Sequence, residues 1–148
     1  MKNSVLVSYS RQNRDFVDQF INRLTDEKRE VWIDKEDILY TEEWWQAIKR
    51  GIEASDIFVT VLSPPYMASP VCNLEMRYAR RLNKRFVPIL FADINETQQK
   101  EDLAKRPLDS FEQSLIAEVP NSHLQAIATE NWLHIRKFNW VYIRSART

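Results

Sequence analysis

The residue best placed to do chemistry in this sequence is a single glutamate, Glu75. On a predicted helix it lies about 55° from the mean direction of the apolar residues, so it borders the stripe expected to be buried. Those apolar residues are Val71, Leu74, Tyr78 and Leu82. The position is also near the helix N-terminus, where the helix dipole favours an ionised carboxylate. Most helical glutamates are simply solvated, so this alternative stays open.

Several other kinds of chemistry are excluded or disfavoured by residue counts. One cysteine, Cys72, cannot form an internal disulfide, and with only His123 and His134 beside it we expect no metal site. Cys72 has no histidine close in sequence, which favours a small buried side chain over a nucleophile. The only glycine, Gly51, excludes a P-loop and a dinucleotide fingerprint, because both need several glycines close to phosphate.

Length and charge narrow the class of protein. The chain has 148 residues, 44% of them hydrophobic, which suits one domain with a sizeable core. Lys plus Arg and Asp plus Glu each number 21, so no excess of charge predicts a nucleic-acid or membrane partner. No apolar run approaches the ~18 residues of a membrane span, and no leader cleavage pattern follows Met1. These features predict a cytoplasmic protein.

Short apolar runs alternate with helical patterns along the chain. The runs at 5–7, 31–33, 57–62, 86–91 and 132–135 predict strands, and the order predicts βαβ units around a parallel sheet. Helices are predicted from the apolar spacing of 16–24 and 44–52, and from Ser69-Pro70, a hydroxyl cap before a first-turn proline. Residues 111–119 predict one more helix.

Three segments are harder to interpret. Pro88 cannot donate to a sheet ladder, so it predicts a bulge or a strand end within 86–91. The polar residues 95–106 predict a long loop. Near the C-terminus, residues 140–143 have a strand-like composition.

Four stretches resemble the successive boxes of Toll/interleukin-1 receptor (TIR) domains. They are residues 5–10, 31–34, 57–64 and 69–75, and the last resembles the family's Trp-Cys-x-x-Glu motif through Cys72 and Glu75. The resemblance covers residues 4–135, which we take as the domain. Residues 136–148 would then form a C-terminal extension or the start of a linker to another domain.

The resemblance implies a fold and an activity. The fold is a flavodoxin-like α/β three-layer sandwich, with a five-stranded parallel sheet and helices on both faces. Many members are NAD glycohydrolases, which release nicotinamide and either ADP-ribose or a cyclic isomer, and Glu75 occupies the position of their catalytic glutamate. NAD would be the substrate, with no cofactor, in a signalling or effector protein of bacterial-type defence.

One carboxylate can suffice for this reaction. Most glycosidases need two, because one must protonate the leaving oxygen. The leaving group of NAD is a pyridinium, which departs neutral without a proton. A carboxylate that stabilises the positive ribosyl centre could therefore carry the catalysis.

Four further residues are candidates for substrate binding. Arg11 matches a family arginine near the nucleotide, and Trp44 an aromatic that stacks on the substrate. The alternatives are a surface arginine and plain core packing, which we favour for Trp45. Asp34 could face the same cleft or cap the following loop. Ser8 is the weakest candidate.

The resemblance also implies self-association with other TIR domains. The surfaces would be the BB loop, about Lys35 to Glu43, and the third-helix region, where acidic and basic residues of opposite sign could pair. Two departures from the family are visible: the BB loop lacks its usual glycine near Thr41, and Val71 stands where tryptophan is usual. Two alternatives remain, a TIR adaptor that only oligomerises and a nucleoside-processing enzyme on a similar sheet.

Overall fold

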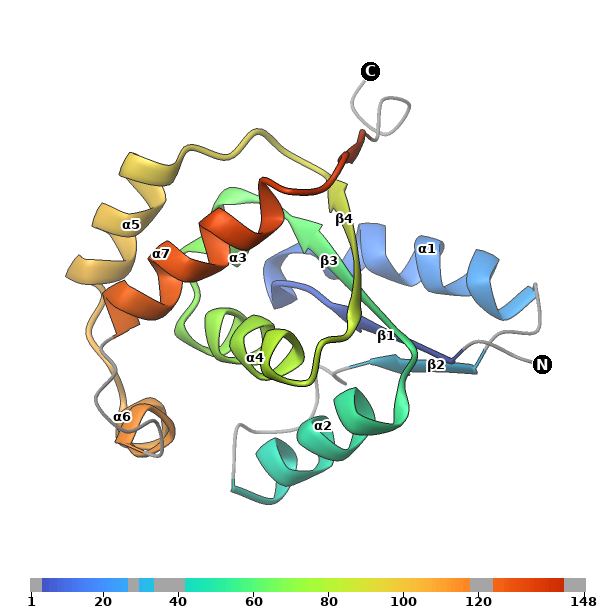
Figure 1. The fold of residues 1–148 in the computed structure, drawn as a ribbon, viewed down its shortest axis with the longest axis horizontal. Helices are drawn as coiled ribbons and strands as arrows, with labels where there is room; N and C mark the ends of the chain where they lie inside the picture. The colour runs from blue at the N-terminus through green and yellow to red at the C-terminus, as the bar shows by residue number, and fades with distance from the viewer. Residues whose placement is uncertain (1–3, 27–29, 34–41, 118–123, 143–148) are drawn as a thin grey trace.

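The computed structural model describes residues 4–26, 30–33, 42–117 and 124–142, which form a sheet covered by helices (Figure 1). The strands are β1 (Ser4–Ser8), β2 (Glu30–Ile33), β3 (Ile57–Leu62), β4 (Arg85–Leu90) and β5 (Val141–Tyr142). Their order is β2-β1-β3-β4-β5, and every neighbouring pair is parallel. This is the strand order of flavodoxin-like sheets.

The connections between strands are helical. They comprise the 3-10 helix η1 (Arg11–Asn13), α1 (Arg14–Asp26), α2 (Glu42–Ala54), α3 (Pro64–Met67), α4 (Pro70–Arg81), α5 (Glu96–Lys105), α6 (Ser110–Ala117) and α7 (Leu124–Ile135). None of the helices in the described part of the chain is long and apolar enough to cross a membrane.

Helices cover both faces of the sheet, as predicted, but unequally. On one face α1 packs through Val17 against alternate residues of the strands, including Val7 and Val61. On the other face α2, α3, α4 and α7 pack against Leu6, Phe58 and their neighbours. Figure 1 shows α1 apart from the group formed by α4, α7 and α2. β1 and β3 are almost entirely buried, which explains their continuous apolar sequence.

Two predictions near the C-terminus are corrected. The apolar run 132–135 was expected to be a strand, but it forms the last turn of α7. A short apolar run is compatible with either a buried strand or a buried helix, and here Trp132 and Ile135 are one helical turn apart and both buried. The last strand is instead β5, which lies within the strand-like residues 140–143, so the sheet continues into the segment expected to be an extension or linker.

Three other expectations also differ from the structure. β4 runs through Pro88 without a bulge, because Pro88 pairs in register with Thr60 of β3 and the described pairing with β5 begins only at Ile89. The polar stretch 95–106 is mostly helix α5, capped by the Asn95 side chain, which accepts from the Gln98 amide at 2.9 Å. Leu82 is not part of the buried stripe: it is 39% exposed at the end of α4.

The position of α4 is fixed by buried amides as well as by apolar packing. Asn73 on α4 and Asn131 on α7 are both fully buried. Asn131 Nδ2 donates to Asn73 O at 3.0 Å and to Asn73 Oδ1 at 2.9 Å. Asn73 Nδ2 donates to the carbonyls of Met67 and Ser69, and Asn131 Oδ1 accepts from Arg80 Nε at 2.8 Å. Burial of these groups is tolerated because each is hydrogen-bonded.

Candidate functional site

Two chain segments meet at the carboxyl end of β1, where open α/β sheets bind ligands. The first is Ser8 to Ser10, whose last residue caps η1 by accepting from the Gln12 amide. The second is the start of α4, where the Ser69 side chain accepts from the Cys72 amide at 3.1 Å and Pro70 follows. The predicted hydroxyl cap and first-turn proline are both confirmed.

Glu75 lies in the second turn of α4 and is buried, with 6% of its surface exposed. The solvated alternative is therefore wrong, because Glu75 is buried together with its neighbours on the first two turns of α4. Its Oε1 accepts a hydrogen bond of 2.7 Å from Ser8 Oγ. Because a buried carboxylate is costly without such partners, this contact both stabilises Glu75 and fixes its direction.

A tyrosine extends this contact into a chain of hydroxyls. Tyr66 OH lies 2.7 Å from Ser8 Oγ, and both residues are buried. Since the single Ser8 proton goes to Glu75, Tyr66 must donate to Ser8. Burial raises the pKa of Tyr66 well above its usual value, with further increases from Cys72 and Glu75, so the phenol keeps the proton that it donates. The arrangement Tyr66 to Ser8 to Glu75 aligns the dipoles toward the carboxylate.

Ser8 is predicted as a substrate contact; in the structure it is 1% exposed and its hydroxyl is hydrogen-bonded to Glu75 and Tyr66. Tyr66 was not predicted at all. The only signal for it in the sequence is that it follows the carboxyl end of a central strand and a capping serine, Ser63, whose hydroxyl accepts from the Tyr66 amide.

A pocket of about 140 Å³ lies beside this group, and we call it the β1–α4 pocket. It is lined by Ser10, Arg11, Gln12, Pro65, Ser69, Val71, Cys72, Arg106 and Glu112. Arg11 thus lies at the carboxyl end of β1 as predicted. Cys72 forms part of the wall one helical turn before Glu75, and its thiol donates to the Tyr9 carbonyl at 3.6 Å.

The far wall of this pocket carries a second buried carboxylate that the sequence analysis missed. Glu112 is 3% exposed and exchanges hydrogen bonds with Asp109: the Asp109 amide donates to Glu112 Oε1 at 3.0 Å, and the Glu112 amide to Asp109 Oδ1 at 2.8 Å. This is a capping box, which a D-x-x-E sequence could have indicated. Arg106 lies 3.5 Å from Glu112. The capping role accounts for the carboxylate.

The two neighbouring tryptophans of α2 are equally buried, Trp44 at 4% and Trp45 at 5%. They stack with ring centroids 6.0 Å apart, and Trp44 also meets Phe111 edge to face at 6.2 Å. The sequence had predicted a cleft position for Trp44 and a core position for Trp45. Asp34 and BB-loop residues 35–41 lie outside the described residues.

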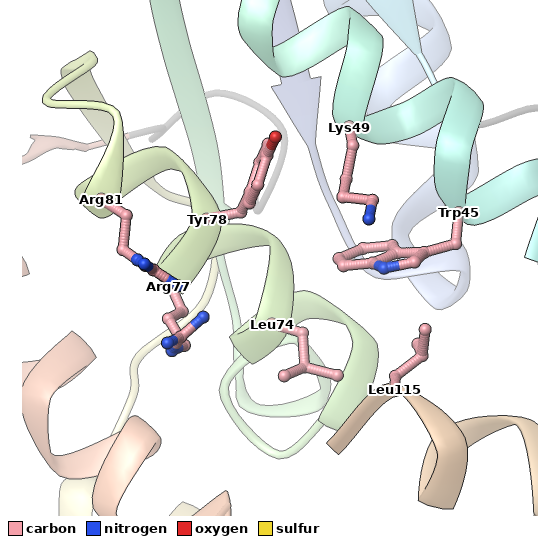
Figure 2. Close-up of a pocket in the computed structure, with 7 residues that line it drawn as sticks. All are labelled: Trp45, Lys49, Leu74, Arg77, Tyr78, Arg81 and Leu115. Carbon is pink, nitrogen blue, oxygen red and sulfur yellow. The ribbon is translucent and has the colours of Figure 1, made fainter. Parts of the chain in front are cut away.

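A larger pocket of about 350 Å³ lies between α2 and α4, and we call it the α2–α4 groove (Figure 2). Its lining residues are Trp45, Lys49, Leu74, Arg77, Tyr78, Arg81 and Leu115. Of the basic residues predicted to face a partner on this helix, only Arg77 and Arg81 line it. Arg80 is bonded to Asn131 and lies 3.7 Å from Glu130, and Lys84 Nζ donates to the carbonyls of Glu53 and Ser55.

Within the described ranges, no three His, Cys, Asp or Glu side chains come together as metal ligands would. Glu75 lies near the carboxyl edge of the sheet with the Ser8 hydroxyl as a donor, and Arg11 lines the pocket at the same edge. Such a site can bind and stabilise a positively charged group without a metal.

Comparisons with known proteins identify the family. A family model described as TIR domain matches residues 5–120, so the chain belongs to the TIR domain family. This family includes NAD-cleaving members and members that act in signalling as adaptors. No curated protein sequence matches the chain significantly.

Among solved structures, the chain is similar to the TIR domains of the activated Roq1 resistosome, an assembly described as directly recognising the pathogen effector XopQ. The TM-score is 0.67 at 15% sequence identity, with 99% of this chain and 90% of the other covered. At this identity the similarity supports the fold.

Proposed function

We propose that the chain is an NAD glycohydrolase in which Glu75 is the catalytic residue. The observation that carries the proposal is the buried Glu75 carboxylate, which is held by Ser8 at the carboxyl end of β1 beside a pocket that Arg11 lines. Membership of the TIR family supports it, since that family contains NAD-cleaving enzymes.

The reaction breaks the bond between C1′ of the ribose and the pyridinium nitrogen. The bonding electrons move to that nitrogen, so nicotinamide leaves as a neutral molecule and positive charge develops at the ribosyl centre. Glu75 stabilises this charge, and its orientation is already set by Ser8 and Tyr66 before the substrate binds. Water then adds to C1′ and loses a proton, or a nucleophile within the substrate attacks to give a cyclic product.

Arg11 is the candidate for binding the phosphates of the substrate. Arginine presents a planar set of donors that matches phosphate oxygens. The β1–α4 pocket is smaller than the ~300–1,000 Å³ usual for whole ligands, so it would take one end of a dinucleotide. Trp44 and Asp34 remain proposed contacts to the substrate.

We also propose that activity is greatest when TIR domains self-associate, through the BB loop and the α4 region, in a cytoplasmic effector protein of bacterial-type defence. The family supports this, because other TIR domains assemble, as in the Roq1 resistosome. The alternative function is an adaptor that self-associates without catalysis. A nucleoside-processing enzyme is the third.

The test is to incubate the protein with NAD and, separately, with nucleosides, and to measure nicotinamide and free base. We expect nicotinamide release by the wild type and a decrease of roughly 10²–10³-fold in Glu75→Gln, because the amide cannot stabilise positive charge in the same way. Glu75→Gln keeps an oxygen for the Ser8 hydroxyl, so its melting temperature should stay close to that of the wild type. Glu101→Gln, on the exposed face of α5, is the matched control.

Each alternative predicts a different outcome. Undiminished nicotinamide release in a folded Glu75→Gln protein would exclude the catalytic assignment. Release of free base from nucleosides without turnover of NAD would identify a nucleoside-processing enzyme. An assembled protein that turns over neither substrate would be an adaptor.

A further inference from the structure

The α2–α4 groove brings together three positively charged side chains. Lys49 comes from α2, while Arg77 and Arg81 come from successive turns of α4; Figure 2 shows Lys49 beside Trp45 and the two arginines next to each other on α4. None of the salt bridges among the described residues involves any of these three cations. Partial burial lowers the pKa of Arg77 and the charge of Arg81 lowers it further, while the charge of Glu130 opposes this shift. The two arginines therefore repel each other, and a bound anion would relieve this.

Two carboxylates near the groove, among the residues that the structure describes, have closer partners than its cations. The Glu53 side chain accepts the hydroxyl hydrogen of Tyr78, and Glu130 lies beside Arg80. Lys49 Nζ lies 5.7 Å from the centre of the Trp45 ring and 6.0 Å from that of Tyr78. These cation–π contacts hold the ammonium over aromatic faces, and Figure 2 shows it between the two rings. The faces of the two rings attract the ammonium without using up its hydrogen bonds. The N–H groups of Lys49 therefore remain able to donate to a ligand.

The rest of the groove is apolar. Leu74 and Leu115 are both nearly buried and form one wall, and Trp45 and Tyr78 form part of another. At about 350 Å³ the groove falls within the lower range of small-molecule sites, which combine apolar walls with a few polar groups. A bare inorganic anion would leave these walls unused.

We propose that the α2–α4 groove is a second ligand site, separate from the Glu75 site, and that it binds a small organic phosphate. Arg77, Arg81 and Lys49 would contact the phosphate, and Leu74, Leu115 and the two aromatic rings would contact the organic part. Arginine suits this role because its guanidinium can donate two hydrogen bonds to one phosphate. The site does not depend on the proposed glycohydrolase activity.

The test uses the full chain and calorimetric titration with three probes: adenosine 5′-monophosphate, inorganic phosphate and adenosine. We expect the monophosphate to bind at least about tenfold more tightly than inorganic phosphate, and adenosine not to bind measurably. Raising the salt concentration should weaken binding.

Variants decide where the probe binds. The double variant Arg77→Gln, Arg81→Gln should bind the monophosphate at least about tenfold more weakly, because it removes two charged donors. Lys49→Met should weaken binding less. Arg50→Gln, next to Lys49 on α2 but exposed and outside the groove, is the matched control and should bind as the wild type does. Glu75→Gln should also bind normally.

Four results would overturn the proposal. The first is unchanged binding of the monophosphate to the double variant. The second is loss of binding in Arg11→Gln alone, which would place the probe in the β1–α4 pocket. The third is inorganic phosphate binding as tightly as the monophosphate, because the apolar walls would then contribute nothing. The fourth is a double variant that alters self-association, measured by sedimentation, while its phosphate binding is unchanged.

Discussion

The two halves of α4 belong to different kinds of site. In the first half, Cys72 lines the β1–α4 pocket, and the Glu75 carboxylate, one helical turn further on, already has a hydrogen-bond donor, Ser8, inside the protein. In the second half, Arg77 and Arg81 line the α2–α4 groove, and their charges have no ion-pair partner among the described residues. One helix thus presents a positioned anion at one end and unpaired cations at the other.

This difference separates positioning from recognition. A charged group with internal hydrogen bonds is fixed in direction before a substrate arrives, which favours electrostatic catalysis. A charged group without such bonds gains most from a ligand of opposite charge, which favours binding. The charges alone would not have distinguished the two regions, because the distinction lies in the partners of each group.

The largest expected effect is on stability, and it comes from Trp45, which lines the α2–α4 groove and is also buried in the core. We expect Trp45→Ala to lower the free energy of unfolding by roughly 3–5 kcal/mol, because it removes a large buried ring. Trp44→Ala should cost a similar amount, since it is equally buried. Urea denaturation measures both, and Lys49→Met, on the same helix, serves as the control with little loss. If Trp44→Ala were nearly as stable as the wild type but bound NAD weakly, Trp44 would be a substrate contact.

A smaller effect should follow from removing the donor to Glu75. Ser8→Ala should lower kcat for NAD about 10- to 100-fold with little change in KM, because a hydrogen bond to a charged group contributes about 1.5–3 kcal/mol. Tyr66→Phe should have a weaker effect, since Glu75 then keeps its direct donor.

The control for Ser8→Ala is Ser55→Ala, another buried serine, which donates to the Gly51 carbonyl far from Glu75. A KM that rises in Ser8→Ala while kcat is unchanged would show that Ser8 contacts the substrate directly. An unaltered kcat and KM would show that Glu75 needs no donor.

The smallest effect concerns assembly. Exposed ion pairs contribute on the order of 0–1 kcal/mol, so self-association should be weak, and specific activity should rise with protein concentration and fall with added salt. Arg81→Glu should reduce this rise, whereas Arg85→Glu, exposed at the start of β4, should not. Reversal of Arg80 is a poor test because it breaks the bond to Asn131. Constant specific activity on dilution, with a monomeric mass throughout, would contradict assembly.

The parts of the fold that were predictable are those in which local pattern and burial agree. The spacing of Phe16 to Ile21 and the cap at Ser69 each predict a helix, and each is present. The run 132–135 failed because its apolar residues fit a strand or a helix equally well, and packing against α4 decided for the helix. Helix α5 was missed because few of its residues are buried, so it shows almost no apolar periodicity.

The site was predictable only where one residue carries its own signal. Glu75 could be found from its angle to the apolar stripe. Tyr66 could not, because its role arises from a contact with a residue distant in the chain. For Glu112 the D-x-x-E sequence could indicate the cap, but not the burial of the carboxylate. For Ser8 the substrate contact stays a prediction, and its contact with Glu75 was not predicted, because alternation in a strand predicts a face but not which side chain meets it.

The buried hydrogen bonds between Asn73 and Asn131 allow only one position of α4 along α7. A shift of α4 by one residue along α7 would break these hydrogen bonds. The two amides are buried, so water could not replace the lost partners and the shift would cost free energy. Apolar contacts alone tolerate such shifts, because one methyl group can replace another. Glu75 lies two residues after Asn73 on the same helix. Its position relative to β1 therefore depends on the contact between α4 and α7. A homologue that changed one asparagine without the other would lose the alignment before it lost the fold, and the two positions should therefore change together in evolution.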